Sequence, residues 1–400
     1  MELVAGYPFW LIKNGLPYQY PKLLQNTRCD VAIVGGGISG ALTAWYCVQA
    51  GIDCMLVDAR SIALGSTSAS TSLLQYELDT PLHKLKKLVG DQNAVRAYQL
   101  CGEAIDKLIE LMDRLAFKEY SRKQSLFFSS RRKEKKMLDK ECRARKEAGF
   151  EVQLLSKEEM KCKYGLDAVS GILSEKGASN DAYLFTHKIL QDCITKGLRV
   201  FDRTPIKNIR PEKRGLILTT DKGYTIAANY MVNATGYEII HFINKKIVNL
   251  DCTYAMISES MAEQKPIWGN NVMMWNTEKP YMYMCPANEN RILIGGADES
   301  FVNIKTMHNY LEKKSALLKK SFDEYFPSIH FKQEFAWSGV FGKTKDSLPY
   351  IGPYLPTPRV FYALGFGGNG ITFSLVAAEI IRDLLLGKKN KDADIFSFSR

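Results

Sequence analysis

The feature that most constrains the fold is a glycine-rich turn between an apolar strand and a helix near the start of the chain. Residues 30–40 read DVAIVGGGISG, in which Gly35, Gly37 and Gly40 have the GxGxxG spacing, and a second apolar strand ends at Asp58. The first glycine makes the tight turn, the second lets the backbone approach a pyrophosphate, and the third lets helix and strand pack closely. The helix N-terminus offers unpaired N–H groups to phosphates, and Asp58 offers its carboxylate to ribose hydroxyls. The segment therefore predicts a dinucleotide-binding βαβ unit in a doubly wound α/β fold.

Length and composition predict a folded chain of more than one domain. The chain has 400 residues, of which 46% are apolar, enough for two or three domains at roughly 100–200 residues per domain. We find no apolar stretch long enough to span a membrane and no secretory pattern in the first residues, so we expect a cytoplasmic protein. The nine cysteines are scattered without a CxxC pair, which predicts reduced structural thiols and no metal site.

The net charge of +11 is concentrated in one segment. Residues 118–148 hold twelve Lys or Arg and five Asp or Glu, a local charge of +7. From Arg131 to Ala148 apolar residues recur at helical spacing, and Gly149 follows as a stop, which predicts an amphipathic helix with a solvated basic face. A nucleic-acid site would normally add exposed aromatic residues or a recognisable module, so we do not expect a nucleic-acid partner.

Three later segments are predicted to converge on the same ligand. Residues 65–72, GSTSASTS, form a hydroxyl-rich loop that we expect to lie against a flat ligand rather than to act as a flexible linker. Residues 198–236 predict a third parallel strand, an antiparallel meander and a return strand that ends at Gly236. Residues 360–387 predict a strand, a glycine-rich turn and a helix whose N-terminus would stabilise negative charge on a bound ring.

Taken in order, these motifs resemble the FAD-dependent oxidoreductases of the D-amino-acid oxidase superfamily, which includes glycine oxidase, sarcosine oxidase and γ-glutamylputrescine oxidase. The resemblance covers nearly the whole chain and rests on VAIVGGGISG, VDAR, GSTSAS, VNATGYE, PYMYMCPANENRILIGGADE, WSGVFGKTKDSLPYIGP and GFGGNGIT. It implies a Rossmann-like FAD-binding domain with an interleaved antiparallel-sheet substrate domain. The FAD-binding domain would comprise residues 1–79, 161–245 and 329–400, and the substrate domain residues 80–160 and 246–328.

The resemblance also implies an activity and a cofactor site. The C–N bond of a small-molecule amine or amino acid would be oxidised by hydride transfer to flavin N5, and the resulting imine would be hydrolysed. Nineteen residues would contact FAD: Gly35, Gly37, Ile38, Ser39, Gly40, Asp58, Ala59, Arg60, Ser66, Thr67, Thr71, Ser72, Leu73, Ile206, Gly236, Gly368, Gly370, Ile371 and Thr372.

Several positions depart from the pattern of the family. Gly339 stands near the cysteine that binds flavin covalently in some sarcosine oxidases, so we expect non-covalent FAD. Phe341 replaces the arginine with which D-amino-acid oxidases hold a substrate carboxylate, and Gln75 and Thr372 replace the corresponding arginine and lysine of sarcosine oxidases. An amine is therefore favoured over an α-amino acid as substrate. Leu293 stands where sarcosine oxidases have an oxygen-activating lysine, which leaves both oxygen and a quinone open as the electron acceptor.

Candidates for substrate contacts come from the second insert and the C-terminal motifs. They are Tyr254, Trp275, Tyr281, Tyr283, Phe341 and Asn369. Residues 281–284, YMYM, alternate as in a strand, so one face would carry both tyrosines toward the cofactor, although the same pattern also fits core aromatics. Asn369 fits either a polar contact or a turn residue.

Two other functions remain open at this point, and a third is weaker. The basic segment suggests a flavin-containing tRNA-modification protein, whose RNA affinity would fall steeply with salt. A flavoprotein without turnover would act as an interaction module, and its flavin would not be bleached by any amine. A dehydrogenase that uses only NAD is the weakest alternative. A yellow colour of the purified protein would exclude it.

Overall fold

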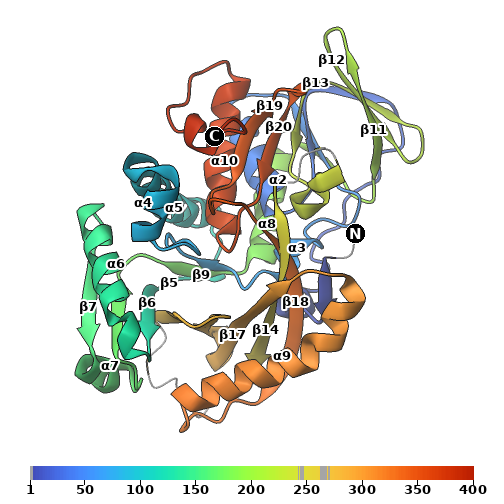
Figure 1. Ribbon diagram of the computed structural model, residues 1–400. Helices are drawn as coiled ribbons and strands as arrows, with labels where there is room; N and C mark the ends of the chain where they lie inside the picture. The colour runs from blue at the N-terminus through green and yellow to red at the C-terminus, as the bar shows by residue number, and fades with distance from the viewer. Residues whose placement is uncertain (1–2, 242, 244–246, 262–267, 269–270) are drawn as a thin grey trace.

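A computed structural model describes residues 3–241, 243, 247–261, 268 and 271–400, and its strands form two large sheets and one small one (Figure 1). The eight-stranded sheet carries the glycine fingerprint. Along the sheet its strands are β10 (Arg199–Phe201), β3 (Cys54–Val57), β2 (Thr27–Val34), β13 (Thr225–Asn233), β12 (Gly215–Thr220) and β11 (Ile206–Glu212), with β20 (Thr357–Leu364) beside β13 and β19 (Tyr350–Tyr354) beside β20.

The parallel strands of this sheet have the order that the fingerprint predicts. The five strands β10, β3, β2, β13 and β20 are joined by parallel pairings, and in chain order they read 3-2-1-4-5. In such sheets ligands bind where the strand order reverses, outside the carboxyl ends of the strands. That position lies here between β2 and β13. The expected third strand, meander and C-terminal strand are all present, but β13 is one continuous strand that serves both the meander and the parallel sheet.

The second large sheet has nine strands and lies below the first in Figure 1. In order these are β1 (Val4–Gly6), β18 (Gln333–Lys343), β14 (Asn249–Ser258), β17 (Arg291–Ser300), β16 (Met282–Ala287), β15 (Val272–Asn276), β6 (Gln124–Ser129), β8 (Ser170–Ser174) and β7 (Val152–Ser156). All the neighbouring pairs are antiparallel except β15 with β6, which run parallel. The expected antiparallel sheet is therefore present, with one parallel pairing where the two inserts meet.

The expected division into two domains stays a prediction, and the strand pairing would move its boundaries at three places. Strands β1, β8 and β18 pair within the nine-stranded sheet, although they lie inside the ranges 1–79, 161–245 and 329–400 expected for FAD binding. The predicted domain boundaries depend on where the FAD-binding motifs lie in the sequence. Membership of a sheet depends instead on pairing between distant segments. A small third sheet is formed by β4 (Leu73–Leu74), β9 (Ala178–Asn180) and β5 (Tyr120–Arg122). It pairs two strands from the predicted FAD-binding ranges with one from the predicted substrate domain.

Helices cover both large sheets. They are α1 (Phe9–Asn14), α2 (Ile38–Gln49), α3 (Ser66–Ala69), α4 (Leu82–Val89), α5 (Asp91–Arg114), α6 (Lys135–Glu147), α7 (Lys157–Tyr164), α8 (Ala182–Thr195), α9 (Ile304–Tyr325) and α10 (Gly370–Leu385). Helix α2 packs against α8 and α10, while α9 crosses strands of the nine-stranded sheet (Figure 1). Among the described residues, none of the helices is both long and apolar enough to cross a membrane. All nine cysteines are free, and all but Cys162 are buried.

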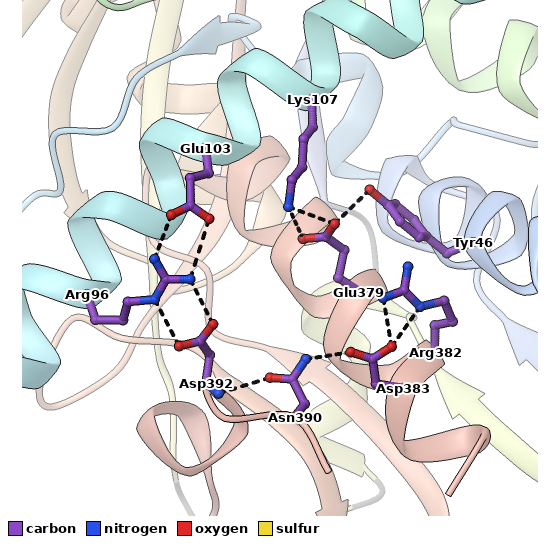
Figure 2. A network of polar contacts seen from close by, with 9 residues as sticks. All are labelled: Tyr46, Arg96, Glu103, Lys107, Glu379, Arg382, Asp383, Asn390 and Asp392. Carbon is purple, nitrogen blue, oxygen red and sulfur yellow. Dashed lines mark hydrogen bonds and ion pairs between the residues drawn. The ribbon is translucent and has the colours of Figure 1, made fainter. Parts of the chain in front are cut away.

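A polar network fixes α5 against α10 and the C-terminal segment (Figure 2). Arg96 binds Asp392 through two hydrogen bonds of 2.9 Å and also pairs with Glu103. One turn beyond Glu103 on α5, Lys107 Nζ donates to both carboxylate oxygens of Glu379 at 2.8 Å. These contacts hold the helix that begins at the C-terminal glycine turn against the first insert.

The basic segment folds largely as predicted, but its charged face is not fully solvated. Helix α6 covers most of the residues 131–148 that were predicted to be helical. The side chain of Arg145, on this helix, is completely buried. Arg145 Nε donates to Glu141 at 2.8 Å, and its Nη1 donates to Glu77 at 3.3 Å. Burial raises the pKa of Glu141, but His83 and Arg145 lower it to about 2. Periodicity identified the helix, but it could not show which basic residue meets buried carboxylates from another segment.

Candidate functional site

A cavity of about 1290 Å³ lies between the two large sheets and brings together most of the residues predicted to bind FAD. Sixteen of the nineteen line it, from the fingerprint, the Ser-rich loop, β11, the end of β13 and the C-terminal glycine turn. The exceptions are Gly40, Ser72 and Thr372, which lie just behind the lining. Ser72 Oγ accepts a hydrogen bond from Ala182 N, and Thr372 Oγ1 donates to Asn369 O.

The fingerprint glycines are required by close backbone contacts. Gly35 has φ of +113°, and a Cβ there would lie 2.3 Å from Ala234 O at the end of β13. A Cβ on Gly40 would lie 1.9 Å from Gly35 O, and one on Gly37 would lie 2.8 Å from Thr67 Oγ1. No real Cβ makes contacts as short as the first two. The start of α2 can therefore sit directly at the carboxyl ends of β2 and β13, where a pyrophosphate would meet its N–H groups.

Asp58 is positioned for a ribose at the end of β3. Its Oδ2 accepts from Gly36 N at 2.6 Å, and its Oδ1 accepts from Arg60 N at 2.7 Å. Each oxygen keeps a further lone pair for a ligand hydroxyl. Burial raises the pKa of Asp58, and the two backbone donors lower it. The Arg60 side chain binds Glu238 instead, through bonds of 3.1 and 2.8 Å.

Two tryptophans hold the Ser-rich loop against the start of α2. Trp10 Nε1 donates to Ser70 O, and Trp337 Nε1 donates to Ala69 O, both at 2.8 Å. Thr67 Oγ1 accepts from Ile38 N at 3.1 Å, which links the loop directly to the fingerprint helix. Residues 66–69 form the short helix α3, so this segment is a fixed wall of the cavity, unlike a flexible linker.

Three of the predicted substrate-side residues lie on the wall of the cavity formed by the nine-stranded sheet. Tyr281 and Tyr283 both line it, and their ring centroids are 6.0 Å apart. Burial raises the pKa of Tyr283 to about 12 and that of Tyr281 well above its usual value, so both phenols are protonated at neutral pH. Phe341 on β18 also lines the cavity, with Lys343 Nζ 4.8 Å from its ring centroid.

The other three candidates differ in their surroundings. Trp275 lines the cavity and stacks on Phe127 with ring centroids 3.9 Å apart. Tyr254 is fully buried outside the lining, where its hydroxyl donates to Glu299, so it is a core residue.

Asn369 lines the cavity, but the structure uses its amide to fix a loop. Its Nδ2 donates to Gln75 O at 3.0 Å and to Glu77 O at 2.9 Å. The two N–H groups are therefore committed to the backbone of residues 75–77. Of the two interpretations given above, the geometry favours a positioning residue at the start of α10.

Sequence reasoning missed a group of charged side chains in the same cavity. It consists of Asp79, Asp251, Asp298 and Lys343, which we call the carboxylate cluster. Lys343 Nζ lies 2.9 Å from Asp251 and 3.7 Å from Asp298. Asp79 Oδ2 accepts a hydrogen bond of 3.2 Å from Gly368 N in the C-terminal glycine turn. Asp298 and Lys343 lie inside GGADE and FGKTKD, so they were visible in the motifs, but only the pairing of β14, β17 and β18 brings them together.

Burial controls the electrostatics of the carboxylate cluster. Burial raises the pKa of Asp298 to about 6, with Asp79 and Asp251 raising it further and Thr253 and Lys343 lowering it. The pKa of Asp79 is also raised by burial, while Lys343 and the Gly368 N–H lower it. Three carboxylates that share one lysine therefore make this end of the cavity favourable for a cation.

Comparison with known proteins identifies the family. Residues 30–384 match the family described as DAO, FAD dependent oxidoreductase. The chain belongs to this family. It is 24% identical to glycine oxidase of Bacillus licheniformis, over 93% of this chain and 96% of that protein. It is 21% identical to gamma-glutamylputrescine oxidoreductase of Escherichia coli, over 92% and 86% of the two chains.

Solved structures share the fold of this family member. Glycine oxidase of Geobacillus kaustophilus superposes with a TM-score of 0.79 over 93% of this chain and 99% of that chain, at 20% identity. The predicted Rossmann-like fold, the family and the use of FAD are thereby confirmed. The residues present also fit FAD on their own terms, because the fingerprint glycines, the N-terminus of α2 and the Asp58 carboxylate are what a dinucleotide requires.

Proposed function

We propose that this FAD-dependent oxidoreductase oxidises the C–N bond of a small-molecule amine or amino acid. The observation that carries the proposal is one continuous cavity, with the dinucleotide fingerprint at one end and Tyr281, Tyr283 and Phe341 with the carboxylate cluster at the other. The names of the relatives support it, since glycine oxidase and gamma-glutamylputrescine oxidoreductase are both named for nitrogen-bearing compounds.

FAD, when bound, supplies the acceptor for a hydride from the carbon next to the amine nitrogen, and water then hydrolyses the imine. The chain would hold it non-covalently through the sixteen lining residues, because Gly339 offers no nucleophile. Tyr281, Tyr283 and Phe341 would bind the body of the substrate and exclude water, a role that suits one buried and two half-buried aromatic rings. None of the three is assigned as a proton acceptor.

We further propose that oxygen reacts slowly and that a quinone is the better electron acceptor. Leu293 is 2% exposed in the core of β17 and does not line the cavity, so no cation is available at that position to promote reaction with oxygen. We propose a cytoplasmic location and no nucleic-acid partner; the burial of Arg145 removes one basic group from the face that an RNA would contact.

The proposal is tested by reducing the bound flavin without oxygen. Purified holoprotein is mixed anaerobically with amines, N-methyl amino acids and D-amino acids, and the visible flavin absorption band is followed. We expect bleaching by at least one compound, with release of an amine or ammonia and a carbonyl product, and faster reoxidation by a soluble quinone than by air. Bleaching only by hydroxy acids or by a reduced nicotinamide, with no response to any nitrogen compound, would overturn the proposal.

A further inference from the structure

One carboxylate in the cavity lacks the partners that buried charges normally have. The Asp298 side chain is only 8% exposed and lines the cavity from β17, yet its cation Lys343 is 3.7 Å away, and its other polar partners are the uncharged hydroxyls of Thr253 and Tyr281. Burying a carboxylate without a cation in close contact is unfavourable, so such a group implies a ligand that completes it.

The neighbours of Asp298 do not neutralise it. Lys343 Nζ lies 3.7 Å away and is bound more closely by Asp251 at 2.9 Å. Asp79 adds a third carboxylate that interacts with Asp298 and is open to the cavity. With all three carboxylates and the lysine ionised, the carboxylate cluster has a net charge of −2. The missing partner is therefore a cation.

A metal ion does not fit this deficit. Among the described residues, no group of three or more His, Cys, Asp or Glu side chains is arranged to hold one. The Lys343 ammonium also lies within the carboxylate cluster, where it would repel a divalent ion twice as strongly as a singly charged ammonium at the same distance. An organic ammonium needs only hydrogen-bond acceptors, which the carboxylates supply.

A carboxylate-bearing ligand is disfavoured at the same place. Lys343 is paired with two aspartates, and Arg60 is paired with Glu238. The lysines Lys84, Lys207 and Lys279 also line the cavity, but all three are exposed, so water and salt screen their charge.

We propose that the substrate carries a second cationic group besides the nitrogen next to the oxidised carbon, and that Asp298, with Asp79 and Asp251, binds this group as an ammonium. The inference rests on the proposed function, which it makes more specific. Tyr281 and Tyr283 line the same cavity, and their rings would contact the carbon chain that separates the two nitrogens.

Three probes of equal chain length test the inference on the oxidised holoprotein without oxygen. Butane-1,4-diamine, n-butylamine and 4-aminobutanoate end in an ammonium, a methyl group and a carboxylate, respectively. Their dissociation constants are measured from the change in the flavin spectrum, before or without turnover. We expect the diamine to bind at least about 10-fold more tightly than butylamine, and the aminobutanoate to bind most weakly. Equal binding of diamine and butylamine, or tightest binding of the carboxylate, overturns the inference.

Variants then assign the preference to the carboxylate cluster. Asp298→Asn should lower diamine affinity by about 10-fold and leave butylamine unchanged, because it removes a charge of the charge-assisted contact. Asp79→Asn provides a second, independent variant. Asp323→Asn, on α9 and paired with Lys319 far from the lining residues, is the matched control and should change neither. An unchanged flavin spectrum and a melting temperature no lower than that of the wild type establish that each variant folds. Unaltered diamine preference in both folded variants contradicts the inference.

These experiments distinguish a failure of the second-cation inference from a failure of the proposed function. If N-methyl amino acids bleach the flavin while the diamine shows no preference, the proposed function stands and the inference is wrong. If no nitrogen compound bleaches the flavin, the proposed function is wrong, whereas the spectral titration still measures whether the carboxylate cluster prefers a second cation. Competition by magnesium ions against the diamine, at matched ionic strength, would identify a metal site and also overturn the inference.

Discussion

The two ends of the cavity differ in how they would bind the charged groups of a ligand. At the fingerprint end, glycines bring backbone N–H groups to the place of a pyrophosphate, and the nearby Arg60 is paired with Glu238. At the other end, three aspartates share one lysine, which lies 2.9 Å from Asp251 and 3.7 Å from Asp298. The first end presents backbone N–H groups to the phosphates and needs no cationic side chain, whereas the second bears an electrostatic cost that a ligand would relieve. The variants below test this difference.

The largest expected effect concerns the buried ion group next to the carboxylate end. Arg145→Ala would leave Glu77 and Glu141 buried without their cation, and Glu77 lines the cavity. We expect the free energy of unfolding to fall by about 3–5 kcal/mol. Urea denaturation measures it, with Arg143→Ala on the exposed face of the same helix as the control, for which a change below about 0.5 kcal/mol is expected. Similar losses in both variants would mean that the buried group has no special role.

The fingerprint end should be sensitive to shape instead of charge. In Gly40→Ala, the new methyl group would lie 1.9 Å from Gly35 O, so helix and strand must separate. We expect FAD affinity to fall at least about 100-fold, close to 3 kcal/mol, as measured by titrating apoprotein with FAD. Gly370→Ala is the matched comparison, because a Cβ there meets no atom within 4 Å and only a bound ligand could oppose it. If Gly40→Ala binds FAD as tightly as the wild type, close packing does not define the site.

The carboxylate end should become more stable when its charge is removed. Burial raises the pKa of Asp298 from 3.8 to about 6, so the folded state holds this proton more tightly than the unfolded state. Unfolding free energy therefore falls as pH rises from about 4 through 6, and the loss remains at higher pH. Without ligand, we expect Asp298→Asn to be about 2 kcal/mol more stable than the wild type at pH 8 and to lack this pH-dependent loss. A variant less stable than the wild type at pH 8 would show that the carboxylate is already satisfied.

These two ends also differ in how far the sequence predicts them. Gly35, Gly37, Gly40 and Asp58 lie within one βαβ unit, so their spacing alone dictates their geometry. The carboxylate cluster joins Asp79 to side chains from β14, β17 and β18, and no local pattern encodes that strand order. The role of Asn369 was undecided for the same reason, because its partners are backbone carbonyls about 290 positions away. Burial of Arg145 likewise depends on Glu77, in a distant segment.

The smallest expected effect tests whether the fingerprint end binds the phosphates without a cationic side chain. Arg60 lines the cavity and was predicted to contact FAD, but both of its terminal nitrogens donate to Glu238. That ion pair is partly exposed, and such pairs contribute about 1 kcal/mol or less. In Arg60→Met, we therefore expect FAD affinity to fall less than about 5-fold in the same titration, with Arg203→Met, whose guanidinium pairs with Asp202, as the control for lost surface charge. A loss as large as that of Gly40→Ala would mean that the phosphates depend on a cation, and the contrast between the two ends would then disappear.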